Sequence, residues 1–348
     1  MRVSLNSYAV LDFFSVLLRL LLALAVLLLA VAFHRRLPFE SSPERIKTQE
    51  ERFYLLFSLS WVLVILNVVS WPLLYLVLQS FIPEWPQAMC IYGIMQIGAG
   101  SEGVSRFLPG LITTLQFAKP ALVFISGAWF VLYLVNRQST MAPLTGRLVV
   151  MLMILGFLSA GDALIEGAYL AIPKREVFLS TGCCTSTAAE DSRATRFVPQ
   201  AMFGSQYRPW LNRAYYGVNL AMVLGLAFFG VRGSKRRVRR ALPWLAAGAL
   251  ISLAVNWTFL TEIAAPVLLH RPHHCPYDLL GEVPESVVGV VFFVLGCFAV
   301  GWAACVAWIA TPCARTPFLA ATIRNVLSLA LFCYVASLVI MLMELSLA

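Results

Sequence analysis

Four cysteines and three histidines are the residues of this sequence best suited to redox or metal chemistry, and all seven lie outside its long apolar stretches. Thiols in an oxidising compartment form disulfides, and thiolate with imidazole is a donor set that suits zinc and copper. Their types predict a Cys/His site in connecting loops, for which three chemistries remain open. The residues are Cys90, Cys183, Cys184, His270, His273, His274 and Cys275.

Structural disulfides are the first alternative. An even number of cysteines outside the cytoplasm most often forms disulfides, and four cysteines allow three pairings. A bond between the neighbours Cys183 and Cys184 would be strained, so we expect these two to pair with Cys90 and Cys275. Each bond would close a long loop and stabilise the fold by about 2–4 kcal/mol.

A metal centre is the second alternative. His273, His274 and Cys275 supply two imidazoles and one thiolate in three successive residues, which predicts a copper or zinc site. Adjacent residues rarely direct all their donors at one ion, so Cys183 and Cys184 would supply further ligands. The sequence has no CxxC or CxxCH motif and no histidine inside an apolar stretch, so neither c-type nor b-type haem has a signature.

Thiol–disulfide exchange is the third alternative. Cys183 and Cys184 would attack a partner disulfide, and Cys90 or Cys275 would act as the resolving thiol. This layout is analogous to that of quinone-linked membrane enzymes that oxidise periplasmic thiols. The CxxC signature of those enzymes is absent here, so the analogy concerns layout alone.

Membrane-spanning helices are the elements that must position these residues. Apolar residues make up 60% of the chain, charged residues 12%, and the mean hydropathy is +0.81. Apolar stretches of about eighteen or more residues predict spans. Eight are present, at roughly 11–33, 53–82, 108–135, 147–172, 211–231, 241–265, 286–311 and 325–346.

The predicted fold is therefore an all-α polytopic membrane protein, with residues 1–348 forming one integral domain of about eight helices. Irregular outer loops are expected at 83–107, 173–210 and 266–285. No internal repeat of fixed period is visible in the sequence.

The distribution of lysine and arginine predicts the orientation. Fifteen of them occur in the first, third, fifth and seventh connections, which are short, and nine are spread over the longer connections and terminus on the other side. The positive-inside rule then places both termini and the Cys/His loops outside the cytoplasm of a bacterial inner membrane. The basic block at 235–240 is expected to contact anionic lipid, and no fold for nucleic-acid binding is present.

Ionisable residues inside the predicted spans form a second group. They are costly at hydrocarbon depth and mark functional sites by default. Asp162 and Glu166 are four residues apart and share a helix face. The group predicts either ion pairs that hold the bundle together or a buried polar pocket for protons or a quinone. Its members are Arg19, Lys119, Asp162, Glu166 and Glu262.

Together the two groups predict a membrane redox protein, or a membrane subunit of a redox complex, whose partners would be the bilayer and other subunits or a periplasmic redox protein. A transporter or permease is the alternative, with the buried charges lining a path and the cysteines forming structural disulfides. A structural anchor for larger partners is the third class. No Walker, HExxH or GxSxG motif points to ATP hydrolysis, zinc proteolysis or serine hydrolysis.

Overall fold

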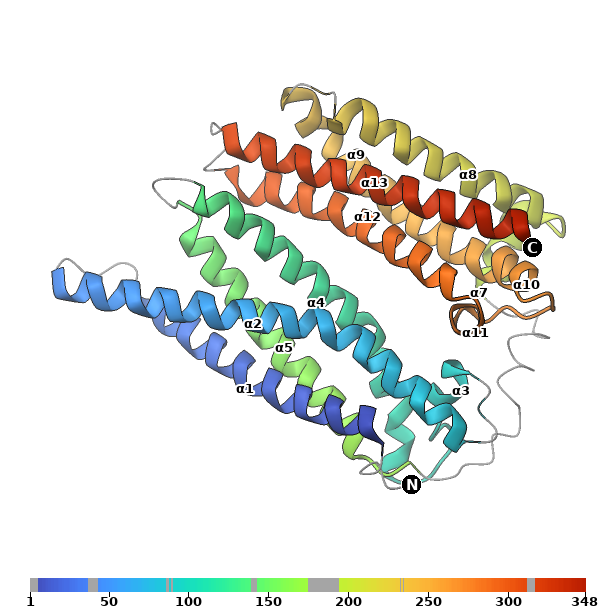
Figure 1. The fold of residues 1–348 in the computed structure, drawn as a ribbon, viewed down its shortest axis with the longest axis horizontal. Helices are drawn as coiled ribbons and strands as arrows, with labels where there is room; N and C mark the ends of the chain where they lie inside the picture. Colours follow the sequence, from blue (N-terminus) through green and yellow to red (C-terminus); the bar gives the residue numbers. More distant parts are fainter. Residues whose placement is uncertain are drawn as a thin grey trace. The chain divides into compact units, whose positions relative to one another are not determined.

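The computed structural model describes residues 6–36, 43–85, 88, 90–138, 143–174, 194–231, 233, 235–311 and 317–348. Within these ranges the chain is helical and has no β-strand, which confirms the predicted all-α fold (Figure 1). Seven helices in the described ranges are long and apolar enough to cross a membrane, and each coincides with a predicted span. The remaining predicted span, 211–231, is helical as well but is not among those seven.

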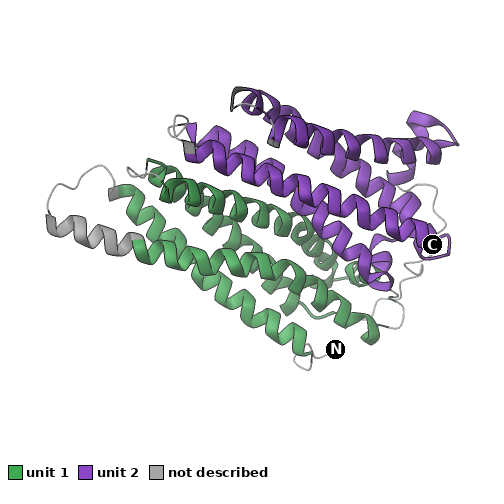
Figure 2. Cartoon of the chain, turned by 45° about the horizontal axis from the view of Figure 1, so that its top comes forward, with its two compact units in different colours: residues 1–180 green, residues 181–348 purple. Residues whose placement is uncertain are grey.

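The chain divides into two compact units, residues 1–180 and 181–348 (Figure 2). Unit 1 contains four long helices: α1 (Ser7–Arg36), α2 (Pro43–Phe81), α4 (Leu108–Arg137) and α5 (Thr145–Ala171). They form a ring in which α1 packs on α2 and α5, and α4 packs on the same two helices. Short helical segments join α2 to α4, namely η2 (Ile82–Glu84), α3 (Ile91–Met95) and η3 (Val104–Phe107).

Glycines on α5 allow α1 to approach it closely. A Cβ atom at Gly156 would lie 3.0 Å from the carbonyl oxygen of Ala23, and one at Gly167 would lie 3.4 Å from Cγ1 of Val16. The two helices therefore run antiparallel, with Ala23 level with Gly156 and Val16 level with Gly167. This register fixes which charged residues of the two helices meet.

Unit 2 also has four long helical elements. The first is α8 (Tyr207–Gly225), which continues into the π-helical η4 (Leu226–Val231), and the second is α9 (Lys235–Phe259), which continues into the π-helical η5 (Leu260–Ala264) and α10 (Ala265–Leu268). The last two are α12 (Pro284–Ile309) and α13 (Pro317–Leu347). These elements again form a ring, in which α8 packs on α9, α9 on α12, α12 on α13 and α13 on α8. Two shorter helices, α7 (Ala194–Phe203) and α11 (Pro276–Glu282), precede α8 and α12.

The two units share one helix plan. In both, the connection between the second and third long helices is extended and contains a short helix, α3 or α11, while the other two connections are short. A cysteine directly precedes that short helix and a tyrosine follows two residues later: Cys90 and Tyr92 in unit 1, Cys275 and Tyr277 in unit 2. The chain therefore contains a structural repeat that its sequence did not reveal.

Candidate functional site

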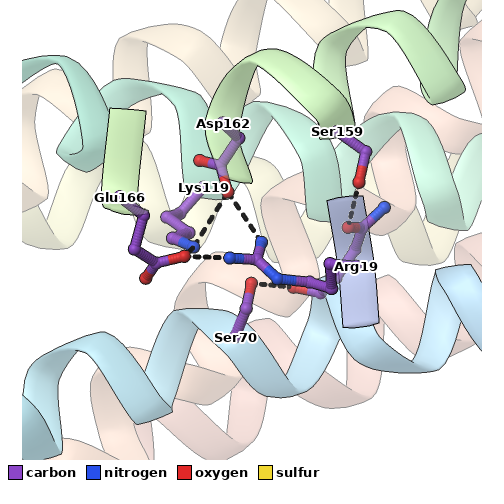
Figure 3. Close-up of polar contacts among 7 residues, drawn as sticks. Arg19, Ser70, Lys119, Ser159, Asp162 and Glu166 are labelled. Carbon is purple, nitrogen blue, oxygen red and sulfur yellow. Dashed lines mark hydrogen bonds and ion pairs between the residues drawn. The ribbon is translucent and has the colours of Figure 1, made fainter. Parts of the chain in front are cut away.

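Four of the charged residues predicted from the sequence meet in unit 1 (Figure 3). Arg19 Nη1 lies 2.7 Å from Asp162 Oδ2, and its Nη2 pairs with Glu166 Oε2. Lys119 Nζ lies 2.9 Å from Asp162 Oδ2 and 2.6 Å from Glu166 Oε2. Each cation thus bridges both carboxylates, and these four residues are called the ion-pair cluster below.

Three helices supply the ion-pair cluster, and the register between α1 and α5 explains how they do so. Arg19 lies between Val16 and Ala23 on α1, so it falls level with the turn of α5 that carries Asp162 and Glu166. The spacing of four residues directs both carboxylates to one face of α5. Lys119 reaches the same point from α4. The pairing expected from the sequence is confirmed for these four residues.

The ion-pair cluster is removed from solvent and incompletely hydrogen-bonded. Arg19, Lys119 and Glu166 have no exposed surface, and Asp162 is 2% exposed. Burial of an ion costs several kcal/mol unless its hydrogen-bonding capacity is used. Three polar atoms of the cluster nevertheless find no hydrogen-bond partner among the described residues: Arg19 Nε, Asp162 Oδ1 and Glu166 Oε1. An arrangement of this kind is expensive as a structural device.

Asp12 is a fifth ionisable residue of this region, and sequence reasoning missed it. It is fully buried on α1, and neither of its carboxyl oxygens has a hydrogen-bond partner among the described residues. Its charged neighbours are Lys119, Arg19 and Asp162. The predicted span begins at residue 11, which places Asp12 at its edge. Its spacing of seven residues from Arg19, two turns of helix, is the signal that could have identified it.

A neutral layer adjoins the ion-pair cluster. Ser159, one turn before Asp162 on α5, donates a hydrogen bond of 2.8 Å to Asn67 Oδ1 on α2. Ser70 on α2 donates to the backbone oxygen of Asn67 at 2.9 Å (Figure 3). This layer links α2 to α5, so all four long helices of unit 1 carry buried polar side chains in one region.

Glu262, predicted together with the unit 1 charges, has its partners in unit 2. It lies in the π-helical η5 and is fully buried. Thr195 donates to its Oε1 at 2.7 Å, and the Tyr207 hydroxyl donates to its Oε2 at 2.8 Å. His274 Nδ1 lies 3.7 Å from the same Oε2 and 3.0 Å from the backbone oxygen of Thr261. Glu262 therefore belongs to a separate buried polar site in unit 2, made with two hydroxyl groups and an imidazole.

The predicted metal ligands have separate surroundings. His273 Nε2 lies 3.1 Å from Asp278 Oδ2, whereas His274 is directed towards Thr261 and Glu262, and Cys275 directly precedes α11. Among the residues that the structure describes, no three His, Cys, Asp or Glu side chains are grouped as metal ligands. The geometry gives no support to a copper or zinc ion at these residues, which stays a prediction from the sequence.

The predicted catalytic cysteines divide between the two units. Cys90 is buried in unit 1 and Cys275 is buried in unit 2, each directly before a short helix. Cys183 and Cys184 lie outside the described residues. Both disulfide pairing and thiol exchange therefore stay predictions.

No family model, no curated protein and no solved structure matches the chain.

Proposed function

We propose that the chain is a proton-coupled membrane transport protein in which the ion-pair cluster of unit 1 is the site that responds to proton binding. The multi-pass helical fold supplies the membrane setting. Ionisable residues inside membrane-spanning helices typically mark ion pathways and proton relays.

The bridged geometry of the ion-pair cluster is the observation that carries the proposal. Arg19 on α1 and Lys119 on α4 each contact both Asp162 and Glu166 on α5. A change of charge at any member alters the forces among all three helices. Proton binding in this region is thereby coupled to the packing of α1, α4 and α5. If the only role were to hold the helices together, apolar side chains of similar size would serve equally well or better.

The small space around the ion-pair cluster favours a proton over an organic ligand. Its four side chains are between 0 and 2% exposed, so they leave little room for a ligand beside them. A quinone head group, expected as an alternative from the sequence, would require these side chains to separate. A proton binds without such a rearrangement.

Two features of the helices favour a transport function over a redox or anchoring function. Prolines occur inside α2 and α4, at Pro72 and Pro120, the π-helical η5 interrupts the second element of unit 2, and the π-helical η4 ends the first. Interrupted helices and repeated helix plans are both frequent in secondary transporters, where they allow one part of the bundle to move. Here the interruptions and the repeat occur together.

The charge pattern completes the proposal with an orientation. Fifteen lysines and arginines fall in the short connections on one side and nine in the longer segments on the other. The positive-inside rule places both termini outside the cytoplasm of a bacterial inner membrane. In that orientation the amino-terminal ends of α1 and α4 and the carboxyl-terminal end of α5 face outward.

Charge displacement in proteoliposomes tests the proposal. The purified full chain is reconstituted, adsorbed on a solid-supported membrane and exposed to a step in proton concentration. We expect a transient current from the wild type and from Glu282→Gln, an exposed acid that pairs with Arg271 on the surface. The current should be lost in Asp162→Asn, and in Lys119→Gln/Asp162→Asn, which removes one charge of each sign.

The control and the double variant make the result decisive. Glu282→Gln is the same kind of acid-to-amide change at a site remote from the ion-pair cluster, and the double variant retains a balanced pair of charges if Asp162→Asn alone fails to fold. A wild-type current no larger than that of protein-free liposomes would overturn the proposal. Equal currents from the wild type and both cluster variants would overturn it as well.

A further inference from the structure

We infer that Asp12 carries a proton while the ion-pair cluster is formed, and that this carboxyl is the group through which protons enter and leave unit 1. The inference deepens the proposed function, because it names the proton-binding residue of the same site. It does not depend on which solute, if any, moves with the proton.

The balance of charge requires one bound proton. Asp12 and the ion-pair cluster together contain three carboxyl groups and two cations; the further buried cation Lys174 lies beyond the end of α5 against Tyr169 and is not among the charged neighbours of Asp12. With every group ionised the region would hold one uncompensated negative charge. An isolated ion in a low-dielectric interior is so unfavourable that such a group becomes neutral instead. One of the three carboxyl groups is therefore protonated at rest.

The contacts identify which carboxyl group that is. Asp162 and Glu166 each pair with both Arg19 and Lys119, and such contacts favour their ionised forms. Asp12 forms no ion pair or hydrogen bond with any described residue, although it is fully buried. The carboxyl group that gains least from ionisation holds the proton, and here that group is Asp12.

The register of α1 on α5 places Asp12 on the outward side of the ion-pair cluster. Val16 is level with Gly167, so Asp12, one turn earlier on α1, is level with the last turn of α5. In the proposed orientation a proton from outside would reach Asp12 before it reached Arg19. Along α1 from the outer surface inward, Asp12 comes first and Arg19 of the ion-pair cluster comes second.

The neighbouring helices present few other groups that could take this role. From α4 the charged neighbour is Lys119, and from α5 it is Asp162, with Glu166 one turn further along. α2 also packs on α1, and between residues 54 and 81 its only titratable side chains are Tyr54 and Tyr75. Asp12 is thus the one carboxyl group of this region without an ion-pair partner among the described residues.

Loss of the proton would act on the ion-pair cluster through Lys119. The carboxylic acid of Asp12 would release one proton to water on the outer side and become a carboxylate, with no transfer of electrons. The new negative charge attracts Lys119 and weakens its hold on Asp162 and Glu166. Because Lys119 lies on α4 and both acids lie on α5, deprotonation would loosen α4 from α5. Proton uptake would restore the bridged arrangement.

Infrared spectroscopy tests the inference on the reconstituted full chain. At neutral pH the wild type should show the carbonyl stretching band of a protonated, buried carboxylic acid. This band should be lost in Asp12→Asn and retained in Glu262→Gln, which alters the buried acid of unit 2. Thermal unfolding provides a second readout, because an amide imitates the neutral acid and should leave Asp12→Asn as stable as the wild type.

The outcomes separate this inference from the proposed function. A band of unchanged amplitude in Asp12→Asn, or a large loss of stability in that variant, would overturn the assignment of the proton to Asp12. A band that disappears in Asp12→Asn, combined with no current after a proton step, would leave the assignment standing and overturn proton-coupled transport. A current that depends on Asp162, combined with no carbonyl band that Asp12→Asn removes, would overturn the assignment to Asp12 and leave proton-coupled transport standing.

Discussion

The two units have the same helix plan, but buried ion pairs join the long helices of unit 1, whereas hydrogen bonds from neutral groups join those of unit 2. Arg19 is the thirteenth residue of α1, and Asn219 is the thirteenth of α8. Asp162 is the eighteenth residue of α5, and Tyr334 is the eighteenth of α13. These two places thus carry ions in unit 1 and neutral polar side chains in unit 2. The helix plan itself does not require charge.

Neutral side chains connect the helices of unit 2. The amides of Asn219 and Asn256 exchange hydrogen bonds of 3.3 and 3.2 Å, which join α8 to α9. The Tyr334 hydroxyl lies 2.8 Å from Ser252 Oγ and 3.2 Å from Cys297 Sγ, which joins α13 to α9 and α12. Neutral hydrogen bonds are less costly to bury than ions. Since this solution exists within the same plan, the ions of unit 1 point to a role beyond cohesion.

The largest expected effect contrasts two aspartates of unit 1. Asp162→Asn removes a charge that both cations contact, and it should destabilise the chain by about 3–5 kcal/mol, since it leaves buried charge uncompensated. Asp12→Asn is the same substitution on a side chain without a described ion-pair partner, and it should cost less than about 1 kcal/mol. Thermal or denaturant unfolding in one detergent measures both. Equal losses would show that Asp12 is ionised and paired.

The neutral centre of unit 2 provides the next contrast. Asn219→Leu leaves the half-buried amide of Asn256 with only its hydrogen bond to the backbone oxygen of Ser252, and should cost about 1–3 kcal/mol. The double variant Asn219→Leu/Asn256→Leu removes both amides and should recover part of that loss, which a double-mutant cycle measures. In unit 1, an analogous pair of changes at Lys119 and Asp162 should recover less, because Arg19 loses its contact with Asp162 and Glu166 loses its contact with Lys119. Full recovery there would weaken the distinction between the units.

Close packing of α1 on α5 in unit 1 predicts a smaller effect on stability, which differs in sign between two glycines of α5. A Cβ atom at Gly156 would lie 3.0 Å from the backbone oxygen of Ala23, so Gly156→Ala should push α1 from α5 and cost about 1–3 kcal/mol. Gly161 lies on the same helix and has nothing within 4 Å of its Cβ position. Gly161→Ala should therefore be neutral or stabilise by up to about 1 kcal/mol. Similar results for the two would show that α1 and α5 are not held together as described.

The sequence predicted the fold class, seven of the spans and the meeting of four charges, because each depends on local signals. Length and hydropathy identify spans, and the spacing of four between Asp162 and Glu166 fixes their shared face. The position of Asp12 depended on the register between α1 and α5, which Gly156 and Gly167 determine and which hydropathy does not show. The repeat was missed because matching places carry different side chains, such as Arg19 and Asn219. Glu262 gave no local sign that its partners come from α7 and α8.

Lys174 offers the smallest effect and a dependence on pH. It lies just after α5, donates to the backbone oxygen of Tyr169 at 3.0 Å and sits 4.4 Å from the centre of that ring. Burial lowers the pKa of Lys174 from 10.5 to about 8. Between these values the unfolded chain binds more protons than the native one, so this group makes stability rise with pH. We expect the wild type to gain about 1–2 kcal/mol over Lys174→Met between pH 8 and pH 10, measured by unfolding at several pH values. A constant difference would show that Lys174 remains charged throughout and that the carboxyl-terminal end of α5 is open to water, in contrast to the dry ion-pair cluster two turns away.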